Sequence, residues 1–125
     1  MYKKTTPIEH QEQTALFDWA RVQSQAIPAL RLLHAIPNGG KRSPATARLL
    51  KAEGVKPGVP DICLPVARGG YHGLYVELKR REGGRVSVEQ RRWLIALVGE
   101  GYRCCVCHGW EDARNTIIGY LEGEP

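Results

Sequence analysis

The chain has 125 residues, the size of one domain with one hydrophobic core, so we expect a single domain over residues 1–125. Hydrophobic residues make up 42% and charged residues 25%, a balance that argues against disorder. We expect a cytoplasmic protein with no membrane partner, because the sequence shows neither a long apolar run nor a secretory signal. The formal net charge of +5 favours a polyanionic partner such as nucleic acid.

The first predicted helix begins near Thr6 and ends at Pro28. At about 100° per residue, one stripe of this helix should face the core. The stripe consists of Ile8, Glu12, Ala15, Trp19, Val22 and Ala26. Glu12 is its only acid, and a buried acid needs a partner. Glu9 lies on the adjoining stripe with Gln13, Leu16 and Ala20, and it could serve only to cap the helix start.

A strand is predicted at residues 30–36, and a glycine loop with two cations follows it. The loop residues are Asn38, Gly39, Gly40, Lys41 and Arg42. Such a loop can cradle a phosphate through its backbone N–H groups, or it can be a plain turn with exposed cations. The second helix should begin at Ser43 and end at Gly54, and its N-terminal dipole favours the phosphate contact.

Two apolar runs, 62–66 and 74–79, predict strands joined by a glycine-rich reversal. If they pair antiparallel around Gly69, facing residue numbers sum to 138 and Asp61 faces Glu77. Facing Cβ atoms lie about 4.5–5.5 Å apart, so two carboxylates can share one divalent cation. Lys79 lies on the same strand face as Glu77. The pattern predicts two acids and a lysine in one site; the alternative is a turn residue followed by an ordinary solvated strand.

The rest of the chain is predicted as a basic loop, a helix, a strand and a last helix. The loop carries Arg80, Arg81 and Arg85, and Ser87 and Gln90 form a capping box that opens the third helix. The apolar side of that helix consists of Trp93, Leu94, Leu97 and Val98. The strand at 102–107 carries a C-C-x-C cluster of three cysteines, which we interpret as buried residues in preference to a zinc site. The last helix should cover residues 111–121.

Five stretches in order resemble the VRR-NUC family of the PD-(D/E)XK nuclease superfamily, particularly its small stand-alone phage and bacterial members. The matching stretches are 8–13, 36–42, 58–61, 77–79 and 87–90. The resemblance implies an α/β (α+β) fold with a restriction-endonuclease-like core, in which helices flank a central mixed sheet. It also implies a homodimer in the cytoplasm of a bacterium or of a phage-infected host cell.

The resemblance also implies roles for individual residues. Asp61 and Glu77 look like metal-binding acids, with the backbone carbonyl of Leu78 as a further ligand. Lys79 looks like the catalytic lysine, and Gln90 looks like the glutamine that supports it.

The motif and the helical stripe disagree about the acid of the first helix. By the resemblance, Glu9 is this acid and a further candidate metal ligand, whereas the stripe favours Glu12. We follow the motif, since capping does not prevent Glu9 from reaching a nearby metal.

The predicted activity is hydrolysis of DNA phosphodiester bonds with Mg²⁺ or Mn²⁺ and no organic cofactor. The resemblance suggests structure-specific endonuclease cleavage of branched DNA, including Holliday junctions. Symmetric cutting of two strands needs two active sites, so a two-fold dimer is expected if junctions are resolved. The glycine loop and the three arginines of the basic loop are candidate DNA contacts. The alternative is a non-catalytic basic DNA-binding module, which leaves the acids among the cations unexplained.

Overall fold

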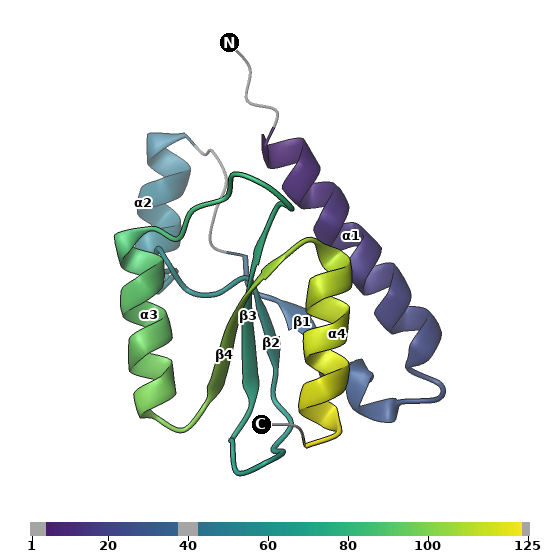
Figure 1. Ribbon diagram of the computed structural model, residues 1–125. Helices are drawn as coiled ribbons and strands as arrows, with labels where there is room; N and C mark the ends of the chain where they lie inside the picture. The colour runs from purple at the N-terminus through teal and green to yellow at the C-terminus, as the bar shows by residue number, and fades with distance from the viewer. Residues whose placement is uncertain (1–4, 38–42, 124–125) are drawn as a thin grey trace.

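The computed structural model describes residues 5–37 and 43–123, with the backbone alone at residues 5–7. Its elements in chain order are α1 (Thr5–Gln23), the 3₁₀ helix η1 (Pro28–Leu32), β1 (His34–Ala35), α2 (Pro44–Ala52), β2 (Ile62–Leu64), β3 (Leu74–Lys79), α3 (Val88–Gly99), β4 (Arg103–His108) and α4 (Trp110–Leu121) (Figure 1). The strands form a four-stranded sheet in the order β1-β2-β3-β4, antiparallel except for the parallel pair β3–β4. The predicted α+β fold with a mixed sheet is therefore confirmed. Within the described ranges, no helix is long and apolar enough to span a bilayer.

The register of the central hairpin is the predicted one. Ile62 pairs with Val76, and Leu64 pairs with Leu74, so facing residue numbers sum to 138. The strand β2 ends at Leu64, two residues earlier than predicted. Pro65 has no N–H to donate, and the N–H of Val66 bonds back to the carbonyl of Leu64 at 2.9 Å, which turns the chain away from β3.

The two faces of β3 have different surroundings. Leu74, Val76 and Leu78 are buried in the hydrophobic core, to which α1 and α4 contribute. Side chains alternate along a strand, so Glu77 and Lys79 lie on the opposite face. Both α1 and α4 contact β3, whereas α3 contacts β4. The acidic and basic residues of β3 are therefore separated from the main core by the sheet itself.

The prediction of a strand at residues 30–36 is confirmed only at residues 34 and 35. The chain forms η1 and then the two-residue strand β1. Leu30 and Leu33 are buried, whereas Leu32 between them is 52% exposed. A spacing of three residues matches the repeat of a 3₁₀ helix, whereas a half-buried strand alternates every second residue.

The predicted core-facing stripe of α1 is confirmed only in part: Glu12 is buried and Trp19 packs against the core. The buried residues of α1 are Glu12, Leu16 and Ala20, whereas Ile8 is 40% exposed and Val22 is 72% exposed. Leu16 is fully buried in the core, and Trp19 lies half-buried at its margin. Glu12 belongs to the predicted stripe and also lies on the face that is buried in the structure.

The ends of the first two helices differ in how well they were predicted. Helix α1 ends at Gln23, five residues before the predicted end at Pro28. The carbonyl of Gln23 accepts a hydrogen bond from the N–H of Ile27 at 2.8 Å, which closes the last turn. Helix α2 ends at Ala52, and Gly54 has a φ of 100°, as expected of a glycine just past a helix end.

Candidate active site

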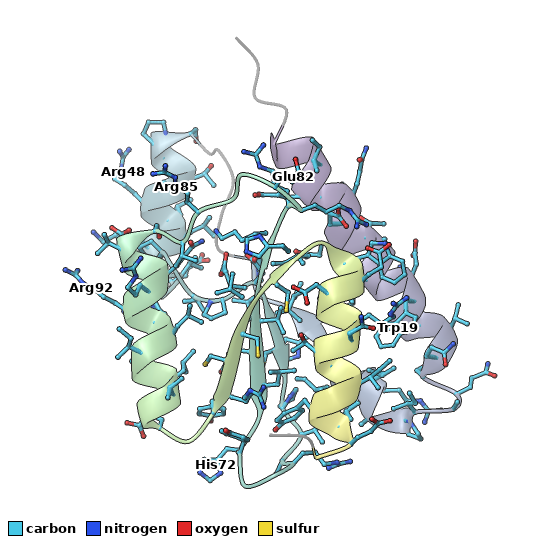
Figure 2. All side chains as sticks on the ribbon, in the orientation of Figure 1. Trp19, Arg48, His72, Glu82, Arg85 and Arg92 are labelled. Carbon is cyan, nitrogen blue, oxygen red and sulfur yellow. The ribbon has the colours of Figure 1, made fainter. Side chains whose placement is uncertain are left out.

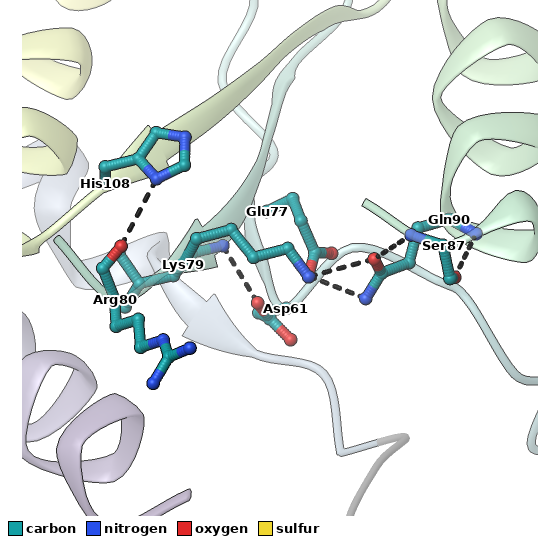
Figure 3. Close-up of polar contacts among 8 residues, drawn as sticks. Asp61, Glu77, Lys79, Arg80, Ser87, Gln90 and His108 are labelled. Atoms are coloured by element: carbon teal, nitrogen blue, oxygen red, sulfur yellow. Dashed lines mark hydrogen bonds and ion pairs between the residues drawn. The ribbon is translucent and has the colours of Figure 1, made fainter. Parts of the chain in front are cut away.

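Asp61 directly precedes β2, and a backbone group of β3 holds its side chain. Its Oδ2 accepts a hydrogen bond of 2.8 Å from the N–H of Leu78 (Figure 3). This bond brings the Asp61 carboxyl group to the carboxyl group of Glu77, with which it interacts electrostatically. The structure therefore brings the two predicted acids together at the open end of the hairpin.

Lys79 and Gln90 complete a closed set of contacts around Glu77. The Lys79 Nζ lies 3.2 Å from Glu77 Oε2 and donates a hydrogen bond of 2.9 Å to Gln90 Oε1. The Gln90 Nε2 donates in turn to Glu77 Oε2 at 2.9 Å. Glu77 and Lys79 are both buried, so each group is held by its neighbours more firmly than a solvated pair would be.

The start of α3 explains why Gln90 reaches this position. The predicted capping box is present: Ser87 Oγ accepts from the N–H of Gln90 at 3.1 Å, and Gln90 Oε1 accepts from the N–H of Ser87 at 2.8 Å. The same Oε1 accepts from Lys79, so capping and contact with the site occur together. Gly58, with a φ of 91°, allows the preceding loop to lie against the backbone of Glu89.

Burial and like charge make the acid pair hard to ionise. Burial, and then the negative charge of Asp61, raise the pKa of Glu77 from 4.5 to about 8. Burial likewise raises the pKa of Asp61. Among the described residues, Glu77 Oε1 is buried and has no hydrogen-bond partner. An unsatisfied buried acceptor beside a second carboxylate is what a divalent cation would compensate.

The donor set fits an oxygen-preferring cation. The Leu78 N–H points to Asp61, and the carbonyl of the same strand residue points to the same side, beyond the end of β2. In the described part of the chain, no group of three or more His, Cys, Asp and Glu side chains could hold a metal ion. The candidate set is therefore two carboxylates and a carbonyl, all oxygen, which suits Mg²⁺ or Mn²⁺ better than zinc.

Glu12 is committed to contacts outside this site. Its Oε1 accepts from the N–H of Trp110 at 2.9 Å, and its Oε2 accepts from Arg81 Nε at 3.1 Å. The buried acid of the helical stripe thus links α1 to the first turn of α4. Glu9 is half-buried one turn earlier on α1, and its selection as the functional acid stays a prediction.

The candidate DNA contacts are in part outside the described residues. The predicted glycine loop lies outside the described residues; it consists of Asn38, Gly39, Gly40, Lys41 and Arg42. Arg85 is exposed (Figure 2). The guanidinium of Arg80 donates to the carbonyl of Gly83 at 3.3 Å.

Arg81 is the candidate contact with a competing role. It is ion-paired with Glu111 and Glu12, and its hydrogen bond to Glu111, followed by the charge of Glu12, raises its pKa. These long-range partners, which sequence reasoning missed, reduce the availability of Arg81 for a phosphate.

Comparison with known proteins identifies the family. The sequence model of the VRR-NUC domain family matches residues 2–111 of this chain. A solved structure described as a VRR_NUC domain protein has a TM-score of 0.80 and 28% sequence identity, with 94% of this chain and 90% of that chain covered. None of the curated proteins matches. The family match includes both acids, the lysine and the glutamine of the site, and the chain belongs to the VRR-NUC domain family, with a nuclease-type function.

Proposed function

We propose that the chain is an Mg²⁺- or Mn²⁺-dependent endonuclease that hydrolyses phosphodiester bonds in DNA. The observation that supports this best is the buried carboxyl group of Glu77, whose Oε1 is unpartnered among the described residues and which lies beside Asp61 and Lys79. Clustered buried groups with a strongly shifted pKa are typical of functional sites.

Asp61, Glu77 and the Leu78 carbonyl would hold the cation. When bound, a divalent cation would polarise a phosphoryl oxygen and lower the pKa of a bound water. Lys79 would orient the attacking water and offset the charge that builds up on the phosphate. Gln90 acts through the lysine, because its amide oxygen holds the ammonium group and its amide nitrogen holds the acid.

The proposed substrate is branched DNA, including Holliday junctions, cut by a homodimer. Net positive charge favours a phosphate backbone. A bare DNA-binding module does not account for two neighbouring acids that burial makes hard to ionise, whereas a bound cation would compensate them. Two copies related by a two-fold axis would present two sites to opposing strands of a junction.

Cleavage assays on a panel of DNA structures test this proposal. The panel contains linear duplex, single-stranded, flap and four-way-junction DNA, each with Mg²⁺, Mn²⁺ or EDTA. We expect cleavage only with metal, and none from Asp61→Asn, Glu77→Gln or Lys79→Met. The matched control is Glu100→Gln, which changes an exposed acid at the other end of α3 and should retain wild-type cleavage.

Two results would contradict the proposal. Undiminished cleavage in EDTA would show that the reaction does not need a metal. Undiminished cleavage by the folded Asp61→Asn and Glu77→Gln proteins would show that it does not need these acids. Sedimentation tests the dimer separately: a monomer that makes paired incisions in a junction would exclude the symmetric arrangement.

A further inference from the structure

A cavity of about 450 Å³ lies beside the candidate site. The residues that line it include Ile36, Glu53, Val55, Lys56, Val59 and Trp93. This volume is within the range of pockets that hold small organic ligands. The role proposed above for the acids and the lysine does not use this cavity.

Three connections place the cavity next to the acid pair. The N–H of Ile36 donates a hydrogen bond of 2.7 Å to the backbone carbonyl of Asp61. Val59 lies two residues before Asp61 in the chain. Trp93 lies three residues after Gln90 on α3, and residues at this spacing are neighbours on one side of a helix. A group in the cavity would therefore be close to one bound at Asp61 and Glu77.

The walls of the cavity suit a flat aromatic group. The Trp93 Nε1 donates to the carbonyl of Pro57 at 3.1 Å, which fixes the orientation of the indole ring. Most of the other walls are aliphatic, whereas Lys56 and Glu53 supply a cation and a hydrogen-bond acceptor and are both exposed. A nucleobase can use all three: its ring stacks on an aromatic face, its ring N–H or amino groups donate to a carboxylate, and the adjoining phosphate attracts an ammonium group.

We propose that this cavity holds one unpaired nucleobase adjacent to the phosphate that is cut. The inference rests on the proposed nuclease function and narrows its substrate class. A base within a stacked duplex cannot enter a pocket, because it must first leave the stack. The preferred DNA would therefore carry an unpaired nucleotide beside the cleaved bond, as at a branch point, in a flap or in a single strand.

A comparison of base-containing and abasic DNA tests the inference in two ways. In EDTA, binding of an oligothymidylate of about 12 nucleotides is compared with binding of an abasic oligomer of the same length by fluorescence anisotropy. With Mn²⁺, a single abasic residue is moved stepwise across the cleavage site of a flap substrate. We expect wild-type protein to favour the base-containing oligomer by roughly tenfold, and cleavage to fall by a similar factor at one abasic position.

Variants of the cavity show whether Trp93 is responsible. Trp93→Ala should reduce the base-containing to abasic ratio towards one, whereas Trp93→Phe should retain most of it. Because Trp93→Ala also loses the bond to Pro57, Val55→Trp provides a second route by filling the cavity. Val98→Trp, at a 56% exposed position of α3 that does not line the cavity, is the matched control and should keep the wild-type ratio.

The outcomes separate this inference from the proposed function. The inference is overturned if no abasic position affects cleavage and the protein binds both oligomers equally. The proposed nuclease function would then still stand. A base preference that persists in Trp93→Ala and in Val55→Trp also overturns the inference. A third outcome is base-dependent binding that these two variants abolish, in a protein that cleaves none of the DNA panel. This outcome supports the base pocket and contradicts the proposed nuclease function.

Discussion

Gln90, in the first turn of α3, donates a hydrogen bond of 2.9 Å from Nε2 to Oε2 of Glu77 on β3. The other end of the same amide accepts from Lys79 and from the N–H of Ser87. One side chain thus joins the helix start to both charged residues of the strand. Its removal should affect the geometry of the site more than the stability of the helix.

Gln90→Ala and Ser87→Ala separate these two roles. Gln90→Ala removes the contacts to Glu77 and Lys79, and we expect cleavage to fall about 10- to 100-fold with DNA affinity unchanged. Ser87→Ala removes only the capping hydroxyl, so it should cost about 1 kcal/mol of stability and leave cleavage by folded protein intact. Single-turnover kinetics and denaturant titrations measure the two effects. Equal losses of cleavage in both variants would show that Gln90 acts only as a cap.

The raised pKa of Glu77 predicts a pH dependence of stability in EDTA. Burial and Asp61 raise this pKa from 4.5 to about 8, so the folded protein binds the proton more tightly than the unfolded chain. The stabilisation is fully present below pH 4.5 and is lost as the pH rises to about 8. The denaturation midpoint should therefore decrease as the pH rises from 4.5 to about 8. In Glu77→Gln this decrease should be smaller.

Metal addition provides the complementary measurement. At pH 8, Mn²⁺ should raise the midpoint of the wild-type protein by binding the folded state, and it should have little effect on Glu77→Gln. If the wild-type protein and Glu77→Gln showed the same pH dependence of stability, Glu77 would be excluded as its origin. If both responded equally to Mn²⁺, Glu77 would be excluded as a metal ligand.

Substitutions on α1 decide between its two acids. Glu12→Ala leaves the N–H of Trp110 without its acceptor, and it should destabilise the protein by about 1–3 kcal/mol. If Glu9 is the functional acid, Glu9→Gln should reduce cleavage while the stability stays near that of the wild type. Thermal denaturation and cleavage rates of both variants measure this. A stable Glu12→Gln protein with no cleavage, beside a fully active Glu9→Gln protein, would reverse the assignment.

Two glycines with nearly the same φ form a matched pair for testing the position of α3. Gly58 has a φ of 91°, and a Cβ there would lie 2.7 Å from the carbonyl carbon of Glu89. Gly70 has a φ of 87°, and a Cβ there would meet nothing within 4 Å. Gly70→Ala should cost about 1–2 kcal/mol for its backbone conformation alone. Gly58→Ala should cost more and lower cleavage, because the helix start and Gln90 must shift.

Denaturant titration and cleavage assays on these two alanine variants make the comparison. Equal destabilisation with equal activity would show that the contact with Glu89 has no influence on the site.

Local patterns in the amino-acid sequence are enough to determine the central hairpin and the capping box. Alternation along two short apolar runs, with glycines between them, sets which residues face each other, and Leu64 indeed pairs with Leu74. The same register brings Asp61 to Glu77 and keeps Lys79 on the face of Glu77. The pairing of Ser87 with Gln90 spans one helical turn, so it too could be predicted.

Tertiary packing decided which side of α1 is buried and what its acid contacts. Two adjoining stripes of α1 were nearly equal in sequence, and the core selected the stripe with Leu16. Glu12 finds its partners in Arg81 and the backbone of Trp110, which lie 69 and 98 residues away in the chain. The cavity beside Trp93 likewise joins separate segments. Periodicity acts over a few residues, whereas these contacts exist only once distant segments have packed together.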